Sequence, residues 1–341
     1  MLSDTQMHLI ISRTDAIGDV CLTLPSIGWL KSIRPDWRIT LLVKAYAAPV
    51  ALACHWVDNV AVLPEQMNVT ELSGWLRGLQ ADHIVHVFPN RRIAAAANQA
   101  DIKMRSGVWG RVYHWFNCNN RIWLSRARSP HHEAYLNLLL LSKLLHLPTP
   151  TDAELRQHVV DWSGLRTSLK HAKNQHIVLH PFSRGNGREW PIEHFAALAQ
   201  LMVNDGWHPV LGGTAQDADT FAAHRHLFPA ECLNVMGLDT LESYMQRIAD
   251  AAGLVASGTG PLHIASLLGQ KCVGLFPPKP SVSQTRWGAI GPASTNLQLP
   301  GPCDTACSNH DCACMRAISP AQVWQALQQP LTATLTTDAA L

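Results

Sequence analysis

Residues 254–276 read LVASGTGPLHIASLLGQKCVGLF. Short apolar runs stand at both ends of this stretch, at 254–256 and 272–276, and apolar residues recur with helical spacing over 261–268. A strand, a helix and a second strand in this order form a crossover unit whose two strands lie parallel. The stretch therefore predicts a parallel α/β fold, and it places Gly258 and Gly260 where the first strand meets the helix.

The same alternation continues through the rest of the chain. It predicts strands at 177–180 and 209–211, helices at 192–203, from 217 and at 241–251, and, in the first half, strands at 8–12, 39–43, 60–63 and 84–88. Polar and turn-forming residues at 149–152 and 170–175 separate the halves. Because 341 residues exceed the roughly 250–300 at which a single core stops growing, two domains are expected.

We therefore predict two Rossmann-like α/β domains, residues 1–165 and 174–320. A closing segment, 321–341, is expected to form a helix that packs back on the first domain. The composition, with 47% hydrophobic and 15% charged residues, is that of an ordinary globular protein.

Neither a signal peptide nor a membrane span is expected. The first apolar run, 9–11, is too short for a signal-peptide core, and the longest one, 136–147, is interrupted by polar residues. We therefore expect a cytoplasmic protein. The net charge of +2 says little about partners, and we expect no nucleic-acid partner.

Basic residues are concentrated in one segment of the first domain. From 91 to 128 there are eight bases against one acid, Asp101; the bases are Arg91, Arg92, Lys103, Arg105, Arg111, Arg121, Arg126 and Arg128. Such a segment could face an anionic substrate, with Arg91, Arg92 and Arg105 as candidate contacts, or could be a solvated basic surface.

Asp19 is the first candidate for chemistry. In RTDAIGDVCLTLP, residues 13–25, a strand ends and Gly18 allows a tight turn, so that Asp19 falls in the first turn of a helix. A helix N-terminus favours an ionised carboxylate, which could then accept a proton from a hydroxyl group. A helix cap is the alternative role, and the two are compatible.

Two loops of the second domain suit a diphosphate. HPFSRGNGREWP, residues 180–191, combines Ser183, Arg184 and Arg188 with backbone amides, although a plain surface turn is the alternative. In the second loop Gly258 and Gly260 carry no side chain that would block a phosphate, and Pro261 fits a first helical turn.

The glycines of that second loop could instead serve tight helix-to-strand packing. His263, which follows them, is either a buried helix residue or a ligand contact.

Two acidic or sulfur-bearing patterns could suggest a metal, and we assign none to either. Asp217 and Asp219 stand two apart in an expected helix and so on different faces; Asp217 could contact a ribose or belong to a solvated helix start. Cys303, Cys307, Cys312 and Cys314 are separated by three, four and one residues, which matches no common zinc spacing, so reduced thiols or an adventitious disulfide are the alternatives to zinc.

Four ordered blocks resemble glycosyltransferase family 9, the heptosyltransferases of lipopolysaccharide core assembly. They are AIGDVCLTLP at 16–25, HHEAYLNLLLL at 131–141, REWPIEHFAALA at 188–199, and SGTGPLHIASLLG at 257–269 followed by GLFPPKP; the tail CMRAISPAQV at 314–323 also looks like the family's cysteine-bearing end. The resemblance covers nearly the whole chain.

The resemblance implies a GT-B fold, with the acceptor bound by the first domain, the nucleotide sugar by the second, and chemistry between facing sheets without a metal or other cofactor. By position it implies that Asp19 is the general base and that Arg188 meets the donor phosphates. The other implied contacts are Thr259, Gly260 and His263 in the donor loop, Asp217 at the ribose and Leu238 near the adenine edge.

Two positions depart from the family pattern. Gly258 stands where many members have an acidic residue before the Thr-Gly pair, and Arg188 stands where some have Lys. The first departure removes a potential contact to sugar hydroxyls, and the second changes a point charge to a forked one.

The implied activity is an inverting transfer of heptose from ADP-heptose to the lipopolysaccharide inner core. The expected partners are a nucleotide-sugar donor and an anionic glycolipid acceptor, with peripheral contact at the cytoplasmic face of the inner membrane. The alternatives are another nucleotide sugar such as a UDP-sugar, a sugar-nucleotide epimerase of the same architecture, and a catalytically weak binding protein.

Overall fold

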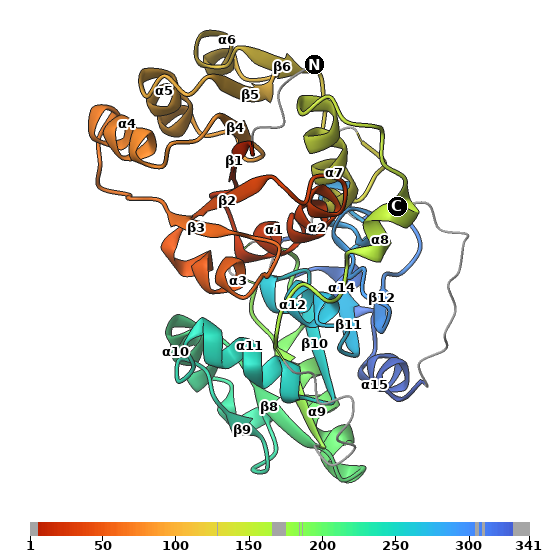
Figure 1. Ribbon diagram of the computed structural model, residues 1–341. Helices are drawn as coiled ribbons and strands as arrows, with labels where there is room; N and C mark the ends of the chain where they lie inside the picture. The colour runs from red at the N-terminus through yellow and green to blue at the C-terminus, as the bar shows by residue number, and fades with distance from the viewer. Residues whose placement is uncertain are drawn as a thin grey trace. The chain divides into compact units, whose positions relative to one another are not determined.

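The computed structural model describes residues 6–127, 129–165, 175–183, 185, 187–303, 307–308 and 311–329. The chain divides into two compact units, Met1–Gly164 and Leu165–Leu341 (Figure 1). Each unit contains one six-stranded sheet in which every described pairing is parallel. The predicted fold class, an α/β protein with two Rossmann-like units, is therefore confirmed.

The sheet of the first unit has the order β3-β2-β1-β4-β5-β6. Its strands are β1 (His8–Ser12), β2 (Arg38–Val43), β3 (Asn59–Val62), β4 (His83–His86), β5 (Met104–Val108) and β6 (Asn120–Ile122). All five residues of β1 are buried, as expected for a central strand covered on both faces. The strand order reverses on either side of β1, and in open α/β sheets ligands bind beyond the carboxyl ends of the strands at such a switch point.

Two groups of helices cover this sheet. One group, at the upper left in Figure 1, is α4 (Val69–Gly78), α5 (Arg91–Gln99) and α6 (Val112–Asn117); the other is α2 (Leu24–Ile33), α7 (Glu133–Leu144) and α8 (Asp152–Gln157). The short α1 (Ile17–Cys21), η1 (Ala45–Ala47) and α3 (Ala48–Leu52) complete the unit. Leu72 and Leu76 of α4 pack with Ile93 and Ala97 of α5 in one apolar cluster, so α4 and α5 share a core.

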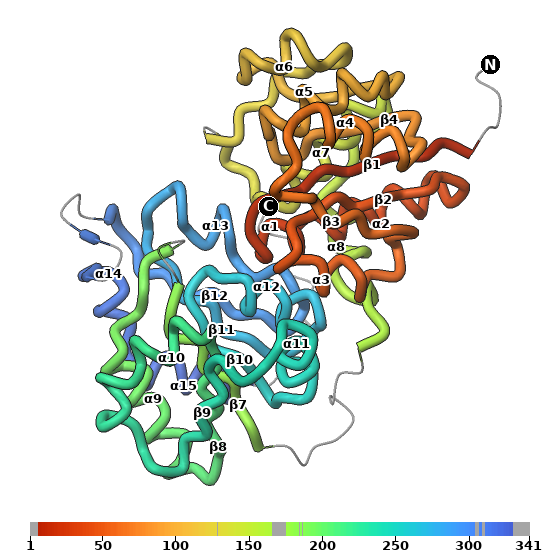
Figure 2. The backbone as a smooth tube through the Cα atoms, turned by 90° about the vertical axis from the view of Figure 1, so that its left-hand side faces the viewer, coloured from red at the N-terminus to blue at the C-terminus, as the bar shows by residue number. Residues whose placement is uncertain are grey.

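The sheet of the second unit has the order β12-β11-β10-β7-β8-β9, with β7 at the switch point. Its strands are β7 (His176–His180), β8 (His208–Leu211), β9 (Leu233–Asn234), β10 (Gly253–Ser257), β11 (Cys272–Leu275) and β12 (Ser294–Leu297). The helices are α9 (Ile192–Asn204), α10 (Ala215–Ala222), α11 (Leu241–Asp250), α12 (Gly260–Leu267), α13 (Gln284–Trp287), α14 (Ala313–Arg316) and α15 (Pro320–Gln328), with η3 (Arg225–Leu227) and η4 (Pro280–Val282). Figure 2 shows α9 and α15 on one face of this sheet and α11 and α12 on the other.

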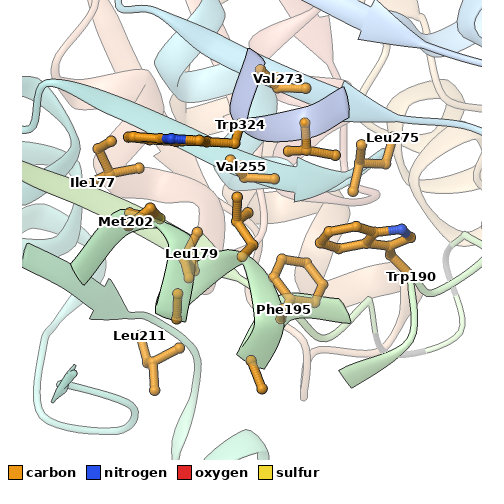
Figure 3. Packing of buried hydrophobic residues seen from close by; sticks show 14 of the residues in the cluster. Ile177, Leu179, Trp190, Phe195, Met202, Leu211, Val255, Val273, Leu275 and Trp324 are labelled. Carbon is orange, nitrogen blue, oxygen red and sulfur yellow. The ribbon is translucent and has the colours of Figure 1, made fainter. Parts of the chain in front are cut away.

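The core of the second unit includes aromatic rings from α9, α15 and the loop after β7. Trp190 and Phe195 pack edge to face at 4.8 Å between ring centroids, close to Leu179, Val255 and Leu275 of the sheet (Figure 3). The Trp190 indole donates a hydrogen bond to the Ile318 carbonyl at 2.9 Å. This bond ties the loop before α9 to the segment that joins α14 and α15.

The closing helix, α15, packs on the second unit. α15 packs against α9 and β11 of the second unit, where the Trp324 indole donates to Asp205 at 2.7 Å and the Lys271 ammonium donates to the Leu327 carbonyl at 2.6 Å. The described part of the segment, 321–329, therefore contributes to the core of the second unit, and its packing on the first domain stays a prediction. Apolar periodicity predicts that a helix buries one face, but it does not say which core that face meets.

Candidate active site

Asp19 lies just beyond the carboxyl end of the central strand β1. As predicted, it stands in the first turn of a helix, α1, and its side chain keeps 18% of its surface exposed. The N-cap of α1 is Ala16, so the alternative role of Asp19 as the cap residue is wrong. Its carboxylate instead pairs with the guanidinium of Arg13.

Arg13 is the centre of an ion cluster that the sequence analysis did not find. Its side chain is only 2% exposed; Nε lies 3.0 Å from Asp15 Oδ1, and Nη2 pairs with Asp19 and lies 3.6 Å from Glu133 Oε1. Although burial opposes the charged form, these three carboxylates raise the pKa of Arg13. Arg13 is thus a permanent cation that holds Asp19 in one place.

The other members of the cluster set its charge. Burial raises the pKa of Asp15 to about 7, with Arg13 opposing this shift and the Asp19 carboxylate adding to it. Arg126 pairs with Glu133 and donates a hydrogen bond to Asn137 Oδ1 at 2.9 Å. The charge beside Asp19 therefore changes near neutral pH through Asp15. The sequence offered one signal for this cluster. Glu133 lies within the block 131–141 that resembles family 9, and Arg13 and Asp15 lie shortly before the block 16–25.

The candidate acceptor arginines have different environments. Arg92 donates to the backbone carbonyls of Met67 and Pro64 at 3.0 and 3.4 Å, and Arg105 donates to those of Asn117 and Ile102 at 2.9 and 2.6 Å. Both therefore tie loops together within the first unit. Arg91 is exposed at the start of α5. Arg128, at the end of the basic segment, lies outside the described residues.

An exposed aromatic patch was also missed. We define it as Trp109, Trp115, Phe116 and Trp123, which lie on α6 and on the loops after β5 and β6. Phe116 and Trp123 are 77% and 75% exposed, and Trp109 stacks on Trp123 with 6.1 Å between ring centroids. The guanidinium of Arg121 lies 4.4 Å above the Trp109 ring. The patch thus joins large apolar side chains to part of the basic segment.

The loops after β7 and β10 meet at the switch point of the second sheet. A Cβ added to Gly187 would lie 3.7 Å from the Gly258 carbonyl oxygen. The Ser183 hydroxyl donates to the Gly187 carbonyl at 3.1 Å, and its backbone amide donates to Glu189 at 2.8 Å. Arg188 follows in this loop and is buried. Arg184 lies outside the described residues.

Thr259 is the N-cap of α12, and Gly260 and Pro261 are the first helical residues. The Thr259 hydroxyl oxygen is buried and has no hydrogen-bond partner within the described part of the chain. Buried polar groups are nearly always bonded, and a helix N-terminus attracts anions. The hydroxyl therefore suits an anionic ligand. His263, one turn further along α12, is buried.

The space beside Gly258 is filled. A Cβ added there would lie 2.8 Å from Cε1 of Phe276, a ring that is 1% exposed at the end of β11. An acidic side chain at position 258 would have to displace this ring. The packing of Phe276 therefore accounts for glycine at position 258, where many family members have an acidic residue.

Asp217 and Leu238 come from neighbouring loops of the second sheet, because the Gly237 amide donates to the Gly213 carbonyl at 3.0 Å. Asp217 is buried and forms a capping box with Thr214, whose amide donates to Asp217 Oδ2 at 2.7 Å. Leu238 is strongly exposed. As predicted, Asp219 lies on a different face of α10 from Asp217, since it is exposed.

The four cysteines of the tail are brought together. The sulfur atoms of Cys303, Cys307, Cys312 and Cys314 all lie within 4.8 Å of one another. The irregular sequence spacing did not predict this convergence.

These features agree with the comparisons with known proteins. The chain matches glycosyltransferase family 9 (heptosyltransferase) over residues 69–315. It belongs to this family. The matched range of this family 9 protein contains the loops after β7 and β10 and Glu133, whereas Asp19 lies upstream of it.

Similar proteins support the same assignment. The chain is 31% identical over 290 residues to lipopolysaccharide heptosyltransferase 2 of Escherichia coli K12, a match that covers 80% of this chain and 83% of the relative. It is 24% identical over 316 residues, 86% of this chain and 89% of the relative, to a putative glycosyltransferase of Haemophilus influenzae. The structure of the E. coli ADP-heptose lipopolysaccharide heptosyltransferase II shares its fold, with a TM-score of 0.73 at 19% identity over 94% of this chain and 97% of that one. The family 9 protein is therefore a glycosyltransferase of the heptosyltransferase type.

Proposed function

We propose that this family 9 enzyme transfers heptose from ADP-heptose to the inner core of lipopolysaccharide, with inversion at the anomeric carbon and without a catalytic metal. The similarity to E. coli lipopolysaccharide heptosyltransferase 2 and to the structure of the E. coli ADP-heptose lipopolysaccharide heptosyltransferase II supports the choice of donor and acceptor. The observation that carries the proposed chemistry is Asp19, a partly exposed carboxylate held by buried Arg13 at the carboxyl end of β1.

Asp19 would act as the general base. It would take the proton of an acceptor hydroxyl while that oxygen attacks the anomeric carbon and the bond from this carbon to the phosphate oxygen breaks. ADP leaves with the bonding electrons, and the proton ends on Asp19 and then in solvent. Arg13 would fix the orientation of the carboxylate, and ionised Asp15 would increase its affinity for the proton.

The loops at the switch point of the second sheet would hold the donor. Ser183, Arg188 and the first amides of α12 offer hydroxyl, guanidinium and N–H donors for a diphosphate, and the buried Thr259 hydroxyl would gain the partner it lacks. These groups would stabilise the leaving diphosphate electrostatically. Leu238 would lie against the base, and Asp217, on the neighbouring loop, would contact the ribose.

The first unit would bind the anionic glycolipid at the membrane surface. Among the described residues no helix has the length and hydropathy needed to cross a bilayer. Exposed tryptophans favour the interface between lipid and water, and neighbouring arginines favour anionic head groups. The aromatic patch together with exposed Arg91 therefore supports peripheral contact with the cytoplasmic face of the inner membrane.

The test begins with Asp19→Asn, which keeps the size of the side chain but removes the base. We expect the rate of transfer from ADP-heptose to fall by about 10²- to 10⁴-fold while calorimetric binding of the donor is retained. Asp36→Asn, at an exposed acidic position of the same unit, serves as the control and should leave the rate unchanged. A full rate in Asp19→Asn would contradict the assignment of the base.

Calorimetry with ADP-heptose, ADP, UDP and UDP-N-acetylglucosamine, with and without chelator, tests the donor and the metal. We expect binding of the ADP compounds that is insensitive to chelator and weakened by Arg188→Ala. Preference for the UDP compounds would reject the heptose donor, and donor conversion without an acceptor would indicate an epimerase instead.

A further inference from the structure

The four cysteines of the tail form a closed set of sulfur atoms. Cys303 and Cys307 lie in the segment after β12, Cys312 is the N-cap of α14, and Cys314 lies within α14. All four sulfur atoms lie within 4.8 Å of one another. A tetrahedral ion with metal–sulfur bonds of about 2.3 Å requires sulfur atoms about 3.8 Å apart. The observed grouping therefore needs only small adjustments to surround one ion.

The surroundings of the sulfur atoms suit a structural site. Cys312 is buried in the core of the second unit, and the other three are half-buried against it.

The alternatives account less well for this arrangement. Reduced thiols used as small apolar residues need no convergence, and the other five cysteines of the chain, Cys21, Cys54, Cys118, Cys232 and Cys272, are each buried at separate places. A disulfide would join two of the four sulfur atoms and would give no reason for all four to meet. Four sulfur ligands without nitrogen or oxygen select zinc or iron among the common metals.

We propose that Cys303, Cys307, Cys312 and Cys314 bind one divalent ion, Zn²⁺ or Fe²⁺, as a four-coordinate structural site. On binding, four thiols release four protons to solvent and the ion gains four thiolate ligands, which gives the centre a charge of −2. All four positions are filled by protein, so the ion has no open position for substrate. The site is therefore separate from the proposed transfer reaction, which needs no metal.

The ion would fix the last part of the second unit. It would join the segment after β12 to α14, and α14 leads to Ile318, whose carbonyl accepts the hydrogen bond from Trp190. Because the unfolded chain has no assembled site, the free energy of metal binding adds to the stability of this unit. Loss of the ion should therefore lower the melting temperature.

The experiment measures metal in the full chain, purified without an affinity tag under thiol reductant. Elemental analysis should find one equivalent of zinc or iron per chain and thereby distinguish the two ions. X-ray absorption should show sulfur ligands alone, at about 2.3 Å. A mercurial reagent that blocks thiols should release the ion and lower the melting temperature.

Cys312→Ser and the more exposed Cys314→Ser should each lose the ion, whereas Cys232→Ser, at a buried cysteine of the same core outside the group, should keep it. Metal-free protein that binds no Zn²⁺ after reduction would overturn the proposal. So would nitrogen or oxygen ligands in the absorption spectrum. Because the spectrum is recorded on the wild-type chain, the proposal remains testable if a serine variant fails to fold.

Discussion

Replacing Arg13 by Met should strongly destabilise the first unit. The substitution keeps an unbranched apolar side chain of similar length but leaves Asp15, Asp19 and Glu133 without the cation they share. The side chains of Asp15 and Glu133 are 17% and 3% exposed, so solvent cannot replace Arg13. Removing one partner of a buried ion pair costs about 3–5 kcal/mol. At about 2–4 °C per kcal/mol for a domain of this size, the melting temperature should fall by about 6–20 °C.

Differential scanning calorimetry and urea unfolding followed by circular dichroism measure this loss. Arg156→Met is the matched control, because Arg156 forms an exposed pair with Asp152 one helical turn away and should contribute only about 0.3–0.5 kcal/mol. Adding Asp19→Asn to Arg13→Met should recover part of the loss, since Asp19 is paired with Arg13 and its charge would be left uncompensated, whereas Glu133 keeps Arg126 as a partner. A loss in Arg13→Met no greater than in the control would refute the claim that this cation holds the carboxylates together.

Three further outcomes follow from the packing and the titrating groups. Gly258→Ala should lower the free energy of unfolding by about 1–3 kcal/mol because its Cβ would lie 2.8 Å from Phe276. In thermal unfolding, the double variant Gly258→Ala/Phe276→Leu should lose less stability than the sum of the losses in the two single variants. Burial lowers the pKa of His86 from 6.5 to about 3, so the first unit should have its full stability above pH 6.5 and lose about 1.4 kcal/mol per pH unit as the pH falls from 6.5 toward 3. When the free energy of unfolding is measured against pH, this slope should be smaller in His86→Asn. The control His226→Asn, at an exposed histidine, should keep the wild-type slope. Because the pKa of Asp15 is about 7, transfer should accelerate as the pH rises through 7, and the pH–rate profile of Asp15→Asn should lack this step.

The sequence predicted the strands that are covered by apolar side chains on both faces of the sheet. The strands predicted at 8–12, 177–180 and 254–256 all correspond to observed strands within two residues of their ends, because a strand covered on both faces reads as a continuous apolar run. β6, with the sequence NRI, lies at a sheet edge and is only half-buried, so it carries no such signal and was not predicted. Apolar patterning thus identified most of the central strands and the edge strand β3, but it missed β5 inside the first sheet and the edge strands β6, β9 and β12.

The candidate site was predictable where it depends on local sequence. Asp19 and the pair Thr259-Gly260 could be placed because each lies in the loop or first helical turn that follows a predicted strand, and the carboxyl ends of parallel strands lie at the same edge of the sheet. The residues that contact Asp19 through the ion cluster could not be predicted in this way, because part of the cluster is distant in sequence. Arg13 reaches Glu133 across 120 positions of sequence, and only the approach of α7 to the end of β1 brings their charges together.

The same distinction explains the tail cysteines. Common zinc spacings describe two short ligand pairs, each held within one tight turn, and gaps of three, four and one residues do not fit them. A metal, however, responds to the positions of sulfur atoms and not to the number of residues between them. Here the start of α14 supplies Cys312 and Cys314, while the segment after β12 supplies Cys303 and Cys307. Spacing can therefore support a metal site when it fits, but it cannot exclude one where two elements of the fold contribute the ligands.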